Sequence, residues 1–210
     1  VRVGSIMAPV PQMLTRAIAN VKRQYSLMDI SITVDTSDML MAQLEKGTLD
    51  LVLGRLTERV ERGSFNFELL GDESLSVVAG FHHPLAKAKQ TTLKALMDYG
   101  WILQPRGSPM RELLELAFAE NGLASPESIV ETAAILITTT LIQHTDMVAV
   151  VPTSVANHYA GKQLLSILPV RLARRLDPYG LVTRRRESLS AAGLVFVNAL
   201  RKESDLARTG

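Results

Sequence analysis

The chain of 210 residues contains no cysteine, and only 5% of its residues are aromatic. The lack of cysteine excludes disulfides, thiolate nucleophiles and cysteine-based zinc sites, and it fits a protein of the reducing cytoplasm. No apolar run reaches the roughly 18 residues that a membrane-spanning helix needs. No secretory leader is visible either, because the chain opens directly on VRVGSI, whose alternation predicts a strand. We therefore expect a cytoplasmic protein.

The residues that are present suit a folded α/β protein. Hydrophobic residues make up 47% of the chain and charged residues 21%, which is too apolar for disorder. The length is large for one compact domain and small for two independent ones, so it suits one α/β unit or two interlocked lobes. The net charge of +2 comes mainly from one local group of arginines. That group could touch an anionic partner, but we interpret it as a solvated surface and do not predict nucleic-acid binding from it. Its members are Arg171, Arg174, Arg175, Arg184, Arg185 and Arg186.

Short β-rich runs alternate with helical periodicity along the whole chain, which predicts βαβ units and parallel sheets. Ser37 is the expected N-cap of the second helix, which should stop at Gly47. Ser108 and Pro109 have the same relation to a later helix. Strands are expected at 1–6, 30–34, 49–53, 74–79, 101–103, 128–131, 147–151, 164–168 and 179–183, and helices at 10–25, 38–46, 93–97, 110–121, 134–144, 154–159 and 191–206.

Four segments in this order resemble the effector-binding domain of LysR-type transcriptional regulators. They are LEKGTLDLVLGRL at 44–56, LLGDESLSVVAGFHHPLA at 69–86, WILQPRGSPMRELLE at 101–115 and LIQHTDMVAVVP at 141–152. The resemblance covers essentially the whole chain, and its pattern is similar to the subgroup that regulates sugar-binding-protein operons. One departure is the turn at 143–146, where Gln, His, Thr and Asp replace the usual glycines.

The resemblance implies a type II periplasmic-binding-protein fold with two Rossmann-like lobes. Regulatory lobe I would comprise 1–75 and 182–210, and lobe II would comprise 76–181. A small-molecule effector would bind in the cleft between the lobes and change the arrangement of lobes or subunits. The resemblance also implies a homodimer, a tetramer of the full-length protein, and DNA binding only through an N-terminal winged helix-turn-helix that this chain lacks.

The candidate ligand-binding residues follow the carboxyl ends of predicted strands, where helix N-termini offer unpaired N–H groups. Three segments have this form: GSIMAP, TSD and QPRGSP. No cofactor or metal is expected. The candidates are Ser5, Ile6, Met7, Ser37, Arg55, Gln104, Arg106, Gly107, Ser108, Arg111 and Thr132.

Most of these candidates have a second interpretation. Each serine can serve as a turn or cap residue as well as a ligand donor. Ile6 and Met7 can line the ligand site or belong to the core. Arg55 can face the ligand or bridge to Glu58 on the surface.

Within QPRGSP, Gly107 allows close approach of the backbone to a bound group. Arg106 or Arg111 can supply a charge-assisted hydrogen bond to a carboxylate, or can point into solvent.

Catalysis is not expected. The histidines are His82, His83, His144 and His158, and none has a visible nucleophile and acid around it. No HExxH, P-loop or GxSxG motif occurs. An alternative with the same fold is a solute-binding protein for transport, which would require an export signal. The arginines favour a carboxylated effector, whereas the serines and threonines also suit a sugar or sugar acid.

Overall fold

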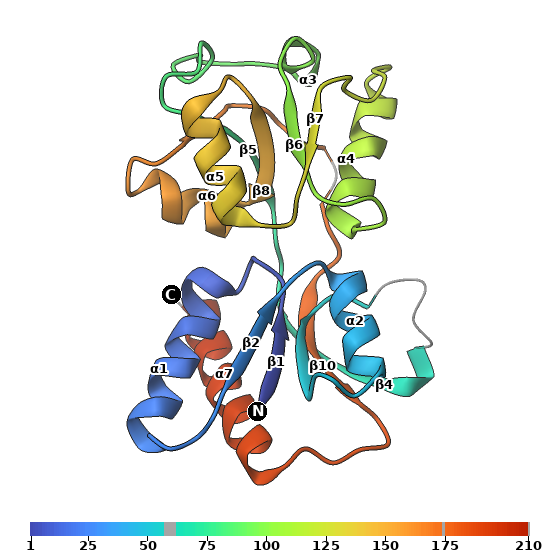
Figure 1. Cartoon of the computed structure of the whole chain (residues 1–210), viewed down its shortest axis with the longest axis vertical. Helices are drawn as coiled ribbons and strands as arrows, with labels where there is room; N and C mark the ends of the chain where they lie inside the picture. The colour runs from blue at the N-terminus through green and yellow to red at the C-terminus, as the bar shows by residue number, and fades with distance from the viewer. Residues whose placement is uncertain (57–61, 174, 210) are drawn as a thin grey trace. The chain divides into compact units, whose positions relative to one another are not determined.

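The computed structural model describes residues 1–56, 62–173 and 175–209, and these form two compact units (Figure 1). Unit 1 comprises Val1–Asp72 and Asp177–Gly210, and unit 2 comprises Glu73–Leu176. The sequence placed the divisions at 75/76 and 181/182, a few residues further along the chain. No described helix is long and apolar enough to cross a membrane.

Unit 1 contains a mixed five-stranded sheet in the order β2-β1-β3-β10-β4. Its first three strands pair in parallel, as the βαβ pattern predicted. The predicted parallel pairing holds for these three strands only, because β10 pairs antiparallel with both β3 and β4. Strand β4 escaped prediction because it lies at the sheet edge, and its sequence FNFELLG mixes exposed and buried positions. The strands are β1 (Arg2–Ser5), β2 (Ser31–Val34), β3 (Leu51–Gly54), β4 (Phe65–Gly71) and β10 (Tyr179–Arg184).

Helices cover both faces of this sheet, with α1 and α7 side by side on one face and α2 on the other (Figure 1). The helical stripe predicted after β1 begins as a π-helix, where Leu14 N–H donates to the Pro9 carbonyl at 2.9 Å. Pro11 lacks an N–H and so cannot take part in regular helical bonding there. The helices are η1 (Val10–Leu14, π), α1 (Thr15–Gln24), α2 (Ser37–Glu45), η2 (Arg62–Ser64, 3₁₀) and α7 (Ala191–Thr209).

Unit 2 contains a second mixed sheet in the order β7-β6-β8-β5-β9. Strand β6 pairs in parallel with β7 and β8, whereas β5 pairs antiparallel with β8 and β9. The strands are β5 (Leu75–Ala79), β6 (Trp101–Leu103), β7 (Ile129–Glu131), β8 (Val148–Pro152) and β9 (Ser166–Ile167). The helices are α3 (Leu93–Leu96), α4 (Pro109–Glu120), α5 (Ile135–His144) and α6 (Thr153–Ala160).

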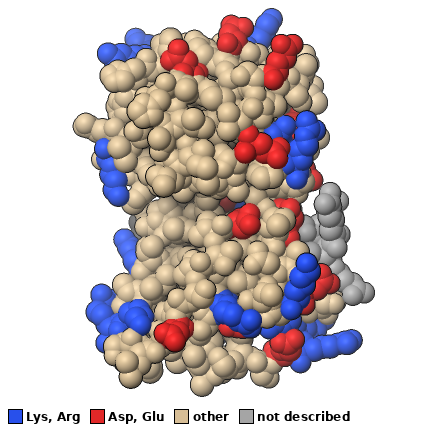
Figure 2. Space-filling view, in the orientation of Figure 1, with Lys and Arg blue, Asp and Glu red and all other residues tan. Residues whose placement is uncertain are grey.

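The charged surface of each unit carries both signs, as the displayed face in Figure 2 shows. Four arginines of the basic group are exposed: Arg171, Arg175, Arg185 and Arg186. Arg184 is mostly buried, with a side chain 17% exposed, and Arg174 lies outside the described residues. The described members of the basic group are therefore divided between the two units, because Arg171 and Arg175 belong to unit 2 and Arg184, Arg185 and Arg186 belong to unit 1.

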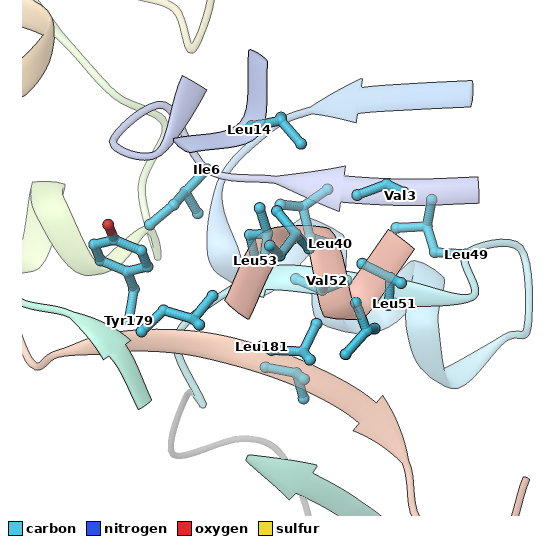
Figure 3. Close-up of a cluster of buried hydrophobic side chains, with 14 of the residues drawn as sticks. Val3, Ile6, Leu14, Leu40, Leu49, Leu51, Val52, Leu53, Tyr179 and Leu181 are labelled. Atoms are coloured by element: carbon cyan, nitrogen blue, oxygen red, sulfur yellow. The ribbon is translucent and has the colours of Figure 1, made fainter. Parts of the chain in front are cut away.

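Buried aliphatic side chains hold the strand ends of unit 1 in place. Val3, Leu51 and Leu53 from the sheet, together with Leu40 from α2, are fully buried (Figure 3). Truncating a leucine at such a position to alanine typically costs about 2–5 kcal/mol, because a cavity remains. In unit 2, the buried indole of Trp101 packs edge-on against Phe118 at 5.0 Å and is likewise part of a fixed core.

The turn at 143–146 needs no glycine. Thr145 has an extended backbone, with φ −141° and ψ 166°, so no residue there has to adopt a left-handed conformation. Its hydroxyl donates to the Leu141 carbonyl at 2.7 Å and accepts from the Met147 N–H at 3.3 Å. A threonine side chain thus supplies the hydrogen bonds that close this turn.

Candidate functional site

Strand β1 places Ser5 beside the ends of its two neighbours in unit 1. Ser5 is paired with Val34 of β2 and Leu53 of β3. The carboxyl ends of these three strands therefore lie together, at the sheet edge that is formed by strand ends and not by an outermost strand. The Ser5 hydroxyl is fully buried and donates to the Ile6 carbonyl at 2.9 Å. Ile6 is buried with the core, while Met7 is partly exposed. The serine keeps its acceptor lone pairs for another group.

Helix α2 begins at the same edge, and its N-cap differs from the prediction. Thr36 is the N-cap, because it keeps an extended backbone (φ −73°, ψ 155°), whereas Ser37 is already the first helical residue. The first backbone bond joins the Leu40 N–H to the Thr36 carbonyl at 3.0 Å. The N–H groups of residues 37–39 therefore have no acceptor within the helix. Both hydroxyl residues are buried, with 4% and 2% exposure, and Thr36 is a further candidate that the sequence analysis did not include.

Arg55 follows β3 and also lies at this edge. Its backbone N–H donates to the Ser37 hydroxyl at 3.2 Å, and its Nε donates to the Asp177 carbonyl at 2.6 Å. The guanidinium lies 6.0 Å from the centre of the Tyr179 ring, and the residue is 5% exposed. Glu58, the alternative partner, lies outside the described residues. A buried cation and two hydroxyl residues thus gather at the start of α2.

The QPRGSP segment of unit 2 forms a capped helix start at the end of β6. Gly107 has φ +87°, a conformation that favours glycine. Ser108 is the N-cap of α4, as predicted, and its hydroxyl accepts from the Arg111 N–H at 3.3 Å. Pro109 is the first helical residue, so its missing N–H costs no hydrogen bond. The Ser108 hydroxyl therefore serves as an acceptor in the cap, and the residue is 1% exposed.

Arg106 and Arg111, which lie on either side of the cap residue Ser108, differ in environment. Arg111 is 2% exposed; its Nε donates to Glu115 at 2.6 Å and its Nη1 lies 3.5 Å from the Gln104 carbonyl. Arg106 is exposed. Arg111 therefore braces the loop from inside, whereas Arg106 is the arginine that a dissolved anion can reach.

Thr132 stands next to this loop at the end of β7. Its N–H donates to the Leu103 carbonyl at 2.9 Å, which fixes it beside the residue that precedes Gln104. The Thr132 hydroxyl accepts from the Ala134 N–H at 3.0 Å and is partly exposed. Unit 2 therefore brings its polar candidates together at one sheet edge, as unit 1 does.

The histidines do not form a reactive cluster within the described residues. His83 is buried against the Tyr99 ring at 4.4 Å, and its Nδ1 accepts from the Leu85 N–H at 3.1 Å. Burial lowers the pKa of His83 below its usual value, and nearby Asp146 partly opposes this shift. In the described parts of the chain, no three His, Asp or Glu side chains lie close enough to hold a metal ion.

The arrangement is suited to holding a small molecule. Each unit offers hydroxyl groups and the start of a helix. Arg55 follows β3 next to the start of α2, and Arg106 precedes the start of α4. Such donors bind carboxylate, carbonyl or hydroxyl oxygens through neutral and charge-assisted hydrogen bonds.

Comparison with known families gives a match over nearly all of the chain. The family model described as "LysR substrate binding domain" matches residues 1–205. The HTH-type transcriptional regulator GbpR of Azospirillum brasilense is 29% identical over 206 residues, which is 98% of this chain. The chain spans 60% of the length of that relative.

Solved structures with the same fold include two that hold ligands. The effector binding domain of QuiR in complex with shikimate has a TM-score of 0.74 and 20% identity, covering 98% of this chain and 97% of its own. The BenM effector binding domain with its effector benzoate has a TM-score of 0.68 and 20% identity, covering 100% and 94%. At these identities the likeness establishes the fold, which is the type II periplasmic-binding-protein-like fold of two mixed sheets with flanking helices.

Proposed function

Because the chain belongs to the LysR substrate-binding domain family, we propose that it is the effector-sensing domain of a LysR-type transcriptional regulator. The observation that carries this proposal is the pair of polar sheet edges, each with buried hydroxyl residues at the start of a helix. Similarity to regulators such as GbpR supports control of transcription over solute capture for transport. DNA would be bound by another part of the regulator, in the cytoplasm.

The proposed contacts belong to two groups, one in each unit. In unit 1 they are Ser5, Ile6, Met7, Ser37 and Arg55, to which we add Thr36. In unit 2 they are Gln104, Arg106, Gly107, Ser108, Arg111 and Thr132. We assign Arg111 an indirect role, because its guanidinium is occupied by Glu115 and by the Gln104 carbonyl.

The proposed effector is a carboxylate, with a sugar or sugar acid as the alternative. Shikimate and benzoate, the ligands of the two similar structures, both carry a carboxylate. The exposed Arg106 and the unpaired N–H groups at the start of α2 offer donors for such a group. Hydroxyl groups of Thr36, Ser37 and Ser108 suit either class.

The effector would act by binding one conformation more tightly than another, since a ligand with equal affinity for both does not change the equilibrium between them. A tenfold bias corresponds to about 1.4 kcal/mol, which one or two charge-assisted hydrogen bonds can supply.

Thermal unfolding with a panel of carboxylates, sugars and sugar acids tests the proposal. An effector at a hundredfold excess over its dissociation constant should stabilise the fold by about 2.7 kcal/mol. Ser37→Ala and Arg106→Ala should reduce that gain, while Arg185→Ala, an exposed arginine that follows β10 at the opposite end of the unit 1 sheet from Ser37, should keep it. A verified effector whose gain is unchanged in both site variants would contradict the assigned contacts.

The domain is further proposed to form a symmetric homodimer through α1 and α5, and the full-length regulator to form a tetramer. Support comes from exposed apolar side chains: Leu136 and Ile137 of α5 are 72% and 48% exposed. In unit 1, Leu27 after α1 is 96% exposed. A self-complementary interface that joins such surfaces would remove them from water.

A further inference from the structure

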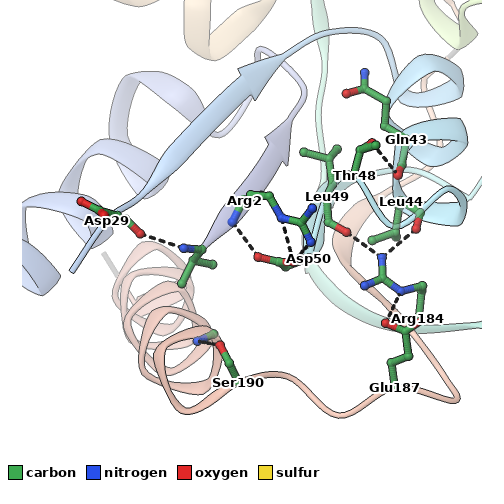
Figure 4. A network of polar contacts seen from close by, with 12 residues as sticks. Arg2, Asp29, Gln43, Leu44, Thr48, Leu49, Asp50, Arg184, Glu187 and Ser190 are labelled. Carbon is green, nitrogen blue, oxygen red and sulfur yellow. Dashed lines mark hydrogen bonds and ion pairs between the residues drawn. The ribbon is translucent and has the colours of Figure 1, made fainter.

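One arginine fastens helix α2 of unit 1 at the end opposite its N-cap. Arg184, the last residue of β10, donates from Nη1 to the Leu44 carbonyl at 2.7 Å and to the Leu49 carbonyl at 2.6 Å (Figure 4). Its Nε lies 2.8 Å from the carboxylate of Glu187. A single guanidinium therefore joins the last turn of α2, the entry to β3 and the end of β10.

Its place is suited to holding a helix end. The last carbonyls of a helix have no intrahelical donor, and they carry the negative end of the helix dipole. The Leu44 carbonyl already accepts from the Gly47 N–H at 3.1 Å, and the Arg184 guanidinium adds a charged donor that faces the negative end of the dipole. Because the Arg184 side chain is only 17% exposed, water competes weakly for these bonds.

The apolar face of α2 cannot fix its position along the sheet by itself. Leu40, Met41 and Leu44 are buried against the core, but apolar contacts are non-directional. Directional bonds occur at the two ends of the helix, where Ser37 accepts from the Arg55 N–H and Leu44 accepts from Arg184. Ser37 and Leu44 are seven residues apart, so a rise of 1.5 Å per residue separates the two bonds by about 10 Å.

We propose that Arg184 is a positioning residue for effector recognition, acting through α2 on Thr36 and Ser37. This proposal rests on the proposed function for the link to an effector, but the placement of α2 can be measured without one. Loss of the guanidinium should let α2 shift along the sheet and weaken the bond between Ser37 and the Arg55 N–H.

The test is amide NMR of the effector-free domain with Arg184→Met, which keeps most of the aliphatic stem and removes all donors. Signals of residues 37–39 and of the Arg55 N–H should shift, although they lie at the far end of the helix. Amide exchange within α2 should accelerate by about a hundredfold relative to α1, because two charge-assisted bonds are lost and each corresponds to about tenfold.

The matched control is Glu187→Gln, which weakens the ion pair and leaves both carbonyl bonds, so α2 should behave as in the wild type. If Arg184→Met does not fold, Arg184→Lys carries the same test, with smaller shifts of the same signals. Changes confined to residues 44–49, with wild-type signals at 37–39, would overturn the proposal. Arg184 would then stabilise only the C-terminal end of α2. That result would leave the proposed effector-sensing function untouched, since no ligand is present.

Discussion

Arg106 of the QPRGSP loop and Arg111 of α4 should differ in their response to the same substitution. Arg111→Met removes a 2% exposed guanidinium that donates to Glu115 at 2.6 Å and lies 3.5 Å from the Gln104 carbonyl. A hydrogen bond to a charged group contributes about 1.5–3 kcal/mol. The Glu115 side chain is 35% exposed and can be rehydrated, so the lower part of that range applies. We expect a loss of about 2 kcal/mol.

Arg106→Met changes an exposed side chain and should alter stability by no more than about 0.5 kcal/mol. For a chain of this size, 1 kcal/mol corresponds to about 2–4 °C in the unfolding midpoint. Circular dichroism should therefore place Arg111→Met about 4–8 °C below the wild type and Arg106→Met within about 2 °C. Glu115→Gln, which keeps an acceptor but removes the charge, should lie between them. A loss in Arg106→Met as large as that in Arg111→Met would refute the assignment of bracing and ligand-facing roles.

Three further predictions concern the fold and assembly. Gly80→Ala should cost about 3 kcal/mol in urea unfolding, because its Cβ would lie 2.1 Å from a carbonyl oxygen of α5, whereas Gly63→Ala meets no atom within 4 Å and should be near neutral. The lowered pKa of His83 means that the unfolded chain binds more protons below about pH 6.5, so stability should fall as pH decreases toward the folded pKa. His83→Gln should flatten that slope, and an unchanged slope would assign it to other groups. Sedimentation at micromolar concentration should show a dimer that Leu136→Glu dissociates and Leu116→Glu, on α4, leaves intact; a wild-type monomer would contradict the dimer.

Much of the fold was predictable because its buried elements have strong local signals. The β6 segment WIL, bounded at Trp101 and Leu103, is wholly apolar, and α4 carries the serine–proline start that marks a helix N-terminus. Strand β4 was missed because its buried residues are Phe65 and Leu70, one near each end. Buried and exposed side chains therefore do not alternate along it. Antiparallel pairing of β10 was also missed, since a strand's direction depends on where the chain re-enters the unit.

The candidate site was predictable in place but less so in detail. The sequence predicted which end of each sheet carries the site, because polar residues directly follow the buried strands along the chain. In TSD, either Thr36 or Ser37 can cap a helix, and only backbone geometry distinguishes them. Arg106 and Arg111 are five residues apart and chemically identical, so their different burial arises from the way α4 turns toward its core. The bond from Arg184 to Leu44 joins residues 140 apart and has no local signal.

Titration calorimetry tests the central claim most directly. With the tightest-binding compound of the carboxylate and sugar panel, the wild-type domain should bind one molecule per chain. Ser37→Ala should weaken binding by about tenfold, as expected for one lost hydrogen bond to a charged group, while Arg185→Ala should bind like the wild type. No saturable binding to any compound of the panel would contradict the assignment of this chain as an effector-sensing domain, whereas equal affinity in all three proteins would contradict the assigned contact at Ser37.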